Sequence, residues 1–188
     1  MNFMQSFKSK NLLRHQNKRV YMPIKIAYLK DHPEAIPALA KIWHNVLGSI
    51  WVPDVPIERV EQRFHDHLND ALLPITFVAF DGSNLVGGVS LRENDGIRPD
   101  LMPWLGSLVV DSAYQKRGIG GLLIDATKQK AREMQFEKLY LFAFDPTLPA
   151  YYARFGFNKI GMDEFRGHHC NSDGNNVVIY HKRVEKSR

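Results

Sequence analysis

The sequence predicts an α/β fold with a single domain, and three observations support this. Short apolar stretches rich in Val, Ile, Leu and Phe alternate with longer stretches whose apolar residues have helical spacing. Residues 105–144 have the order strand, loop, helix, strand, which is typical of two parallel strands joined by a crossover helix. A length of 188 residues and a hydrophobic content of 44% suit one domain with a substantial core.

Seven strands and four helices are predicted along the chain. The strands cover residues 24–28, 75–80, 85–91, 105–110, 138–144, 157–160 and 177–184. The helices cover residues 31–47, 56–68, 122–134 and 148–155. Because no internal repeat and no linker interrupts this order, residues 23–188 are expected to form one domain.

Two helices are predicted before the first pair of strands. Asp31 and Glu34 mark the start of the first helix, and apolar residues then follow at helical spacing: Ile36, Leu39, Ala40, Trp43 and Leu47. The second helix has one apolar face, formed by Val60, Phe64 and Leu68. His65 and His67, near its end, are expected at the surface.

Turn-forming residues separate the predicted strands. The run Asp81-Gly82-Ser83-Asn84 joins two strands and is a hairpin signal. Residues 93–103 contain Asn-Asp-Gly and proline, so they are expected to form a loop. Strand 138–144 is expected to lie parallel to strand 105–110, because a helix connects the two. The polar residues 168–176 are expected to form a loop before the last strand.

The stretch 105–134 carries the strongest functional signal. Its strand is followed by Gln115-Lys116-Arg117, by glycines at 118, 120 and 121, and by the helix predicted from Leu122. Glycine lets a ligand approach the main chain, and the first N–H groups of a helix point toward an anion at its positive end. Lys116 and Arg117 add positive charge there. A diphosphate ligand is therefore expected; a glycine-rich turn that only caps the helix is the alternative.

Two common nucleotide-binding loops do not fit this stretch. A P-loop has Lys-Ser or Lys-Thr after its last glycine, whereas Gly121 is followed by Leu122 here. A dinucleotide-binding fingerprint has its glycines directly after the strand and an acidic residue at the end of the next strand. Here a basic run precedes the glycines, and the next strand ends in Phe142-Ala143-Phe144.

The positive charge of the chain is concentrated at its start. The sequence has 25 basic and 20 acidic residues. Residues 1–22 contain five of the basic residues and no acidic one, so residues 23–188 carry no net charge. A nucleic-acid-binding face on the body is therefore not expected. Residues 1–22 are expected to form a flexible basic leader, which also resembles a transit peptide that is poor in serine.

The composition also bears on the compartment. No apolar run approaches the ~20 residues that span a bilayer, so no membrane association is expected. The first residues lack the apolar segment of a secretory signal. A single cysteine, Cys170, excludes an internal disulfide framework and favours the reducing cytoplasm.

The glycine-rich stretch resembles the acyl-CoA loop of the GCN5-related N-acetyltransferase (GNAT) superfamily, Gln/Arg-x-x-Gly-x-Gly/Ala after a strand ending in Val. Gln115, Gly118 and Gly120 match that pattern. The run Tyr151-Tyr152-Ala153-Arg154-Phe155-Gly156-Phe157 is similar to the superfamily's second signature, Phe-Tyr-x-Lys-x-Gly-Phe. Pro103-Trp104-Leu105 and Glu164-Phe165-Arg166-Gly167 resemble a bacterial branch. The resemblance covers residues 24–184.

This resemblance implies a GNAT-like mixed sheet with helices on both faces, in which strands 105–110 and 138–144 splay apart. It implies acetyl-CoA as co-substrate, with its pantetheine arm paired to the main chain of Leu108, Val109 and Val110. The pyrophosphate would be held by the loop formed by Gln115, Lys116, Arg117, Gly118, Ile119, Gly120 and Gly121.

Acetyl transfer to an amine makes three chemical demands. An alkylammonium with a pKa of about 10.4 is neutral in only ~1 part in 2,500 at pH 7, so the site must lower that pKa or supply a base. The carbonyl oxygen needs a fixed donor, for which the N–H of Val109 or Val110 is the candidate. The departing thiolate needs a hydrogen-bond donor, and the resemblance assigns this catalytic role to Tyr152.

The base and the acceptor pocket are less well marked. Trp104 occupies the position where many family members have a glutamate, so Glu93 or Ser107, acting through a water, are the candidate bases. Trp104 and Ser107 are also candidates for lining the acceptor pocket. His168, His169, Cys170 and Asp173 do not have the spacing of a zinc site, and no metal is expected.

Three functions are compatible with these residues. An N-acetyltransferase acting on a small-molecule amine is the main hypothesis, and an enzyme acting on a protein amino group is the second. The third is a non-catalytic acyl-CoA-binding module, which the presence of Tyr152 argues against. A homodimer is compatible with all three.

Overall fold

The computed structural model describes residues 23–143, 148–165 and 175–184. It contains a single seven-stranded sheet. In chain order the strands are β1 (Lys25–Tyr28), β2 (Ile75–Asp81), β3 (Asn84–Arg92), β4 (Trp104–Val110), β5 (Lys138–Ala143), β6 (Asn158–Phe165) and β7 (Asn175–Arg183). The basic leader predicted for residues 1–22 lies outside the described residues, as do residues 168–174 of the predicted polar loop. Residues 175 and 176, expected in that loop, begin β7 instead.

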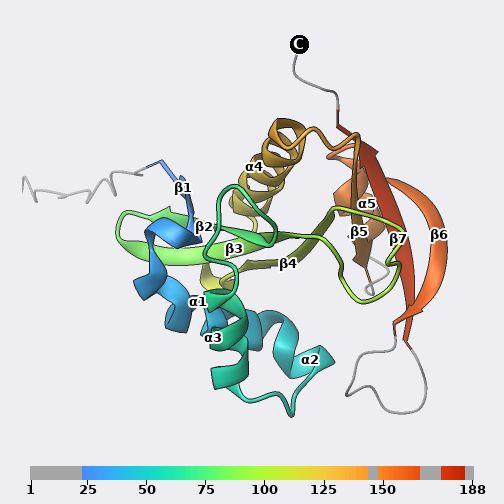
Figure 1. Ribbon diagram of the computed structural model, residues 1–188. Coiled ribbons are helices and arrows are strands. Elements are labelled where there is room, and N and C mark those ends of the chain that lie inside the picture. The colour runs from blue at the N-terminus through green and yellow to red at the C-terminus, as the bar shows by residue number, and fades with distance from the viewer. Residues whose placement is uncertain (1–22, 144–147, 166–174, 185–188) are drawn as a thin grey trace, which may run out of the picture.

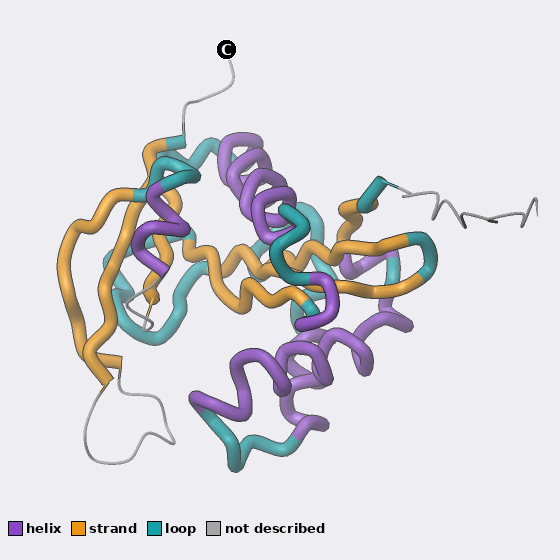
Figure 2. Tube along the Cα trace, turned by 180° about the vertical axis from the view of Figure 1, so that it is seen from behind, coloured by secondary structure: helices purple, strands orange, loops and turns teal. Residues whose placement is uncertain are grey.

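Helices cover both faces of this sheet (Figure 1). The α-helices are α1 (Ile36–Trp43), α2 (Ser49–Trp51), α3 (Ile57–His65), α4 (Ile119–Glu133) and α5 (Leu148–Ala153). Short turns of other helical types are η1 (Leu29–Asp31), η2 (Pro33–Ala35), η3 (His44–Gly48) and η4 (Ser112–Tyr114). Helix α4 lies on one face, and α1, α2 and α3 lie on the other (Figures 1 and 2). The predicted α/β fold with helices on both faces is thus confirmed.

The strands are arranged in the order β1-β2-β3-β4-β5-β7-β6. All neighbouring pairs are antiparallel except β4 and β5, which are parallel as predicted. The predicted hairpin joins β2 to β3, and Gly82 adopts a positive φ of 61° in its turn. Such a φ suits glycine because it has no Cβ.

Strands β4 and β5 form a splayed pair. Their only bridge is between Trp104 and Tyr140, and the N–H of Tyr140 also donates to the carbonyl of Pro103 at 3.0 Å. Beyond that point the two strands diverge, as the family resemblance implied. Main-chain groups on the β5 side of the rest of β4 are therefore left without a strand partner.

A β-bulge interrupts β4 on its other side. Ser90 pairs with Gly106 and Gly88 pairs with Val109, so Val89 faces both Ser107 and Leu108. Ser107 has a φ of 52°, which is uncommon for a residue other than glycine. Side chains alternate between the two faces along a regular strand. The extra residue shifts this alternation by one, so the two parts of β4 on either side of the bulge follow different alternations.

Two apolar cores fill the space on the two faces of the sheet. Helices α4 and α5 cover one core, in which Phe77, Leu105 and Leu123 are buried. Helices α1 and α3 cover the other, in which Val78 and Val109 are buried. Burying one such side chain contributes about 1.5–3 kcal/mol.

The helix boundaries differ from those predicted. Helix α4 begins at Ile119, not Leu122, because Gly118 with a φ of 82° ends the loop and precedes the first helical residue. Residues 31–35, expected to belong to the first helix, fall instead in the end of η1, the connection at His32 and η2. Within the described residues, no helix combines the length and apolar character needed to cross a membrane.

Candidate active site

The glycine-rich loop leads directly into the N-terminus of α4. Gly118 and Lys116 both have a positive φ, 82° and 62°, which turns the chain sharply before the helix. The side chain of Asp111 accepts from the N–H of Ala113 at 2.9 Å and so holds the preceding turn η4. The N–H groups of Ile119 and Gly120 have no intrahelical acceptor, because they belong to the first turn. An anion at this end would therefore meet free donors.

Two side chains of the loop fold back onto β4 and η4. The amide of Gln115 donates from Nε2 to the carbonyl of Val110 at 3.2 Å. Arg117 donates from Nη2 to the carbonyl of Ala113 at 3.0 Å, and its guanidinium lies 4.8 Å from the ring centroid of Tyr114. The positive charge of Arg117 is thus held in place beside the loop.

The two sequence motifs contact each other at the start of α4. A Cβ placed on Gly120 would collide with the hydroxyl of Tyr151, and one on Gly121 would lie 3.1 Å from Cε1 of Phe155. These glycines therefore admit aromatic side chains that precede and follow Tyr152. Their close packing is a second reason for glycine here, besides the approach of a ligand.

Tyr152 is buried in α5, with only 7% of its surface exposed. Its ring lies 6.0 Å from that of Phe157 and 6.3 Å from that of Tyr180. Burial raises the pKa of the Tyr152 phenol well above its usual value, and Tyr151 and Tyr180 add to this effect. The phenol therefore keeps its proton at physiological pH and can donate a hydrogen bond.

The direction of the main chain of β4 distinguishes the candidate oxyanion donors. The N–H of Asp111 donates to the carbonyl of Val86 at 2.9 Å, so it points toward β3. Because main-chain groups alternate along a strand, Val109 also points toward β3, where its partner is Gly88. Val110 then points toward the diverging β5, which agrees with its carbonyl being bonded to Gln115. Of the two candidates, Val110 has the suitable direction.

The two residues considered for the acceptor pocket lie in different environments. Trp104 is completely buried, donates from Nε1 to the carbonyl of Leu101 at 2.6 Å and contacts Tyr140. It is a core residue and does not line an open pocket. Ser107 is partly exposed at the bulge.

Ser107 does not suit the role of base. Its Oγ accepts from Nε1 of Trp43 and from Nη2 of Arg92, both at 3.1 Å. Because a hydroxyl oxygen has two lone pairs, both acceptor positions are occupied and the hydroxyl proton is left to donate. The arrangement makes Ser107 a donor toward its surroundings.

Glu93 is exposed directly after the end of β3. Its neighbours Arg92 and Asp95 are turned inward, where Nη1 of Arg92 lies 2.7 Å from Oδ1 of Asp95. Arg63 of α3 lies close enough to interact with both of them electrostatically: the charge of Arg92 lowers the pKa of Arg63, and the charge of Asp95 raises it. Sequence reasoning missed this buried ionic group, because Arg63 stands 29 positions before Arg92 and 32 before Asp95, and the three residues match no motif.

His67 is buried, contrary to the expectation that it lies at the surface; only 3% of it is exposed. Its Nδ1 lies 2.9 Å from Oγ1 of Thr76 and 3.3 Å from Oγ of Ser90. Burial lowers the pKa of His67 to about 3, and the positive charges of Arg92 and Arg63 act in the same direction. The imidazole is therefore neutral.

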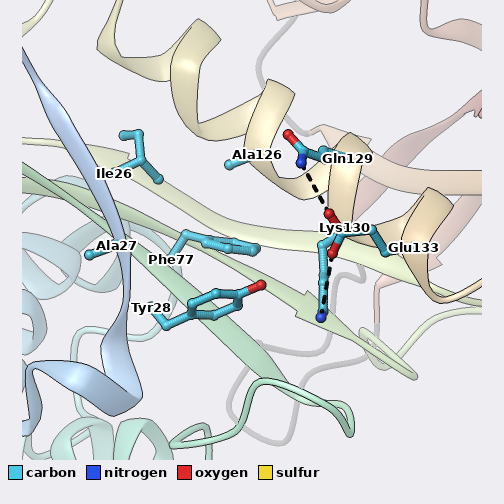
Figure 3. A pocket seen from close by; sticks show the side chains of 8 residues that line it. All are labelled: Ile26, Ala27, Tyr28, Phe77, Ala126, Gln129, Lys130 and Glu133. Carbon is cyan, nitrogen blue, oxygen red and sulfur yellow. Dashed lines mark hydrogen bonds and ion pairs between the residues drawn. The ribbon is translucent and has the colours of Figure 1, made fainter.

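A separate pocket lies near the edge strand β1, between β1, β2 and α4 (Figure 3). It has a volume of about 230 Å³ and is lined by Ile26, Ala27, Tyr28, Phe77, Ala126, Gln129, Lys130 and Glu133. Its residues from α4 begin at Ala126, roughly 10 Å along the helix from the glycine-rich end. This pocket is therefore distinct from the predicted coenzyme site.

Among the residues that the structure describes, no three His, Cys, Asp or Glu side chains are placed to hold a metal ion. The run His168-His169-Cys170 with Asp173 lies outside that part of the chain.

Solved structures with the same fold include several N-acetyltransferases. An aminoglycoside 6'-N-acetyltransferase complexed with coenzyme A superposes with a TM-score of 0.66 at 15% identity, covering 89% of this chain and 99% of the other. The ribosomal-protein-S18-alanine N-acetyltransferase from Escherichia coli gives 0.64 at 16% identity, covering 88% and 97%. A GNAT-family acetyltransferase from Streptococcus pneumoniae gives 0.63 at 18% identity, covering 87% and 100%.

No curated protein matches the chain in sequence. The model of the acetyltransferase (GNAT) family, in contrast, matches residues 40–157. That range contains the bulged strand β4, the glycine-rich loop, α4 and the motif around Tyr152. It spans more than half of the sequence and both motifs, so the chain belongs to the acetyltransferase (GNAT) family.

Proposed function

We propose that the protein transfers the acetyl group of acetyl-CoA to a primary amine of a small molecule, by direct attack within a ternary complex. The observation that carries this proposal is the opening between β4 and β5 beyond Trp104 and Tyr140. Because these strands are parallel, the segments that follow them lie at the same end of the sheet. The glycine-rich loop follows β4, and the helix with Tyr152 follows β5.

In the proposed complex, the pyrophosphate binds the loop from Gln115 to Gly121. The first-turn N–H groups of α4 and the charges of Lys116 and Arg117 support this placement. The N–H of Gly121 already donates to the carbonyl of Gly118 at 3.0 Å, so the amides before it are the better donors. The pantetheine arm then extends along the open side of β4, beside Leu108, Val109 and Val110.

The reaction forms one bond and breaks one. The neutral amine nitrogen attacks the thioester carbonyl, the C–S bond breaks, the amine proton passes to a base, and the departing thiolate takes up a proton from solvent. The N–H of Val110 is the proposed donor to the carbonyl oxygen. Tyr152 is the proposed hydrogen-bond donor to the thiolate. A raised phenol pKa favours this role over complete proton transfer.

The base must help to deprotonate the ammonium group of the acceptor. At pH 7 this deprotonation costs roughly 4.6 kcal/mol for a pKa of 10.4. Glu93 is the proposed base, acting through a water, since it is exposed at the end of β3. Ser107 is set aside because its lone pairs accept two hydrogen bonds.

The decisive experiment measures coenzyme binding by calorimetry in Gly118→Asp and Gly118→Asn. No atom lies within 4 Å of a Cβ at Gly118, and both Asp and Asn tolerate its positive φ. The two side chains have nearly the same size, but only aspartate repels a diphosphate. We expect the aspartate variant to bind acetyl-CoA at least about tenfold more weakly than the asparagine variant.

The outcomes separate the alternatives. Absence of heat with acetyl-CoA and coenzyme A in the wild-type protein would refute the proposed function. Tight binding without thiol release over a panel of amines would instead support a non-catalytic module. Turnover with peptides but not with small amines would support a protein amino group as acceptor.

A further inference from the structure

Arg63, Arg92 and Asp95 form a largely buried arginine cluster on the α1 and α3 side of the sheet. Nη1 of Arg92 lies 2.7 Å from Oδ1 of Asp95. The guanidinium of Arg63 lies 4.3 Å from the ring centroid of Trp43. Only 18% of the Arg92 side chain and 8% of the Asp95 side chain are exposed. The proposed reaction uses none of the three.

The charges of the arginine cluster do not balance. It combines two guanidinium groups with one carboxylate, and the neighbouring His67 is neutral because its pKa is lowered to about 3. Burial and the charge of Arg92 lower the pKa of Arg63 to about 10, despite the opposing effect of Asp95. Burial raises the pKa of the Asp95 carboxyl, while the guanidinium of Arg92 at 2.7 Å holds that carboxyl ionised, so at neutral pH the cluster carries one excess positive charge.

Several donors of the cluster also lack acceptors. Nε and Nη2 of Arg63 and Nε of Arg92 are buried and have no hydrogen-bond partner among the described residues. Stacking of Arg63 on Trp43 uses the face of the guanidinium and leaves its N–H groups in the plane unpaired. Buried polar groups are normally hydrogen-bonded, and an unpaired buried charge is costly. Both facts indicate a site for a group with negative oxygen atoms.

The cluster is connected to the reaction centre through Ser107. Arg92 and Trp43 both donate to its Oγ at the bulge of β4. At about 3.3 Å per residue, Ser107 lies roughly 10 Å along the strand from Val110, the proposed oxyanion donor. The bulge belongs to the part of β4 that has no β5 partner. Helix α4, which follows the glycine-rich loop, lies in contrast on the other face of the sheet (Figure 1).

We propose that the arginine cluster binds a carboxylate of the acceptor, so that the substrate is an amine that carries a carboxylate, as amino acids do. This inference rests on the proposed function of the site. One carboxylate neutralises the single excess charge, whereas a phosphate dianion would exceed it. A carboxylate also matches the planar fork of a guanidinium, with two parallel hydrogen bonds.

The experiment compares ω-amino acids of two to six carbons with the corresponding ω-amino amides. Each compound is titrated into the full-length protein by calorimetry, with and without saturating coenzyme A, and then tested for thiol release with acetyl-CoA. At one chain length we expect the acid to bind about tenfold to a hundredfold more tightly than its amide. Arg63→Met should bring this ratio close to one.

Arg59→Met is the matched control, because Arg59 is exposed one turn earlier on α3 and should leave the ratio unchanged. Equal binding of acids and amides at every chain length would overturn the proposal. So would an equal loss for acid and amide in Arg63→Met, which indicates a structural role. Titrations without coenzyme A keep this result independent of coenzyme binding, so a failure of the proposed function remains distinguishable.

Discussion

The hydroxyl of Tyr151 lies directly against Gly120, at a position where any Cβ would collide with it. The two motifs that identify the family, one before α4 and one in α5, are therefore packed against each other. The glycine-rich loop and the helix with Tyr152 behave as one structural unit at the open end of β4 and β5.

Because of this contact, we expect a substitution at Tyr151 to restore stability that a substitution at Gly120 removes. Gly120→Ala should lower the free energy of unfolding by about 1–3 kcal/mol, because the added methyl group overpacks the contact. Adding Tyr151→Phe removes the colliding oxygen and should restore most of that loss. Urea denaturation of the two single variants and the double variant measures the coupling. Strict additivity of the two changes would show that the contact is not formed.

Tyr152→Phe should lower kcat by about tenfold to a hundredfold, because the thiolate loses its hydrogen-bond donor. The dissociation constant for coenzyme A should change little. Tyr180→Phe, a neighbouring buried tyrosine, serves as the control and should retain activity. Since burial raises the pKa of Tyr152, kcat should not fall between pH 8 and 10 through ionisation of this phenol. Full activity of Tyr152→Phe would refute its role.

His67 should make the protein sensitive to acid. Its pKa is about 3 in the folded state and about 6.5 when unfolded, so below pH 6.5 the unfolded state binds a proton that the folded state does not. Stability should therefore fall as pH decreases from 6.5 toward 3, by about 1.4 kcal/mol per pH unit from this residue. The measurement is the free energy of unfolding between pH 6 and 4.5. His67→Gln should flatten that slope, whereas exposed His65→Gln should keep it; equal slopes in all three proteins contradict the burial.

The positive φ of Ser107 predicts that glycine at this position gives a more stable protein than alanine does. Both Ser107→Ala and Ser107→Gly leave Trp43 and Arg92 without their acceptor, at a cost of about 1–3 kcal/mol. Only glycine relieves the positive φ of 52°. Ser107→Gly should therefore be about 1 kcal/mol more stable than Ser107→Ala. Ala27→Gly in β1 is the control, where glycine should destabilise; alanine proving the better residue at position 107 would contradict the bulge geometry.

The family resemblance and the order of elements could be predicted because both depend on residues close together in the chain. The turn at 81–84, the loop from Gln115 to Gly121 and the motif around Tyr152 each fit within a few positions. Apolar periodicity then predicted the strands on either side. The wrong expectation for His67 has the opposite cause, since its partners Thr76 and Ser90 come from β2 and β3.

The sequence by itself determined the α/β class, the succession of strands and helices, and the acetyltransferase family. Only the tertiary structure decided the bulge at Ser107, the complete burial of Trp104 and the meeting of Arg63 with Arg92 and Asp95. The strand from Leu105 to Val110 is apolar apart from Ser107 and has no alternating pattern that would reveal an extra residue. Packing between distant segments sets such features, and their energies depend on contacts that local patterns do not contain.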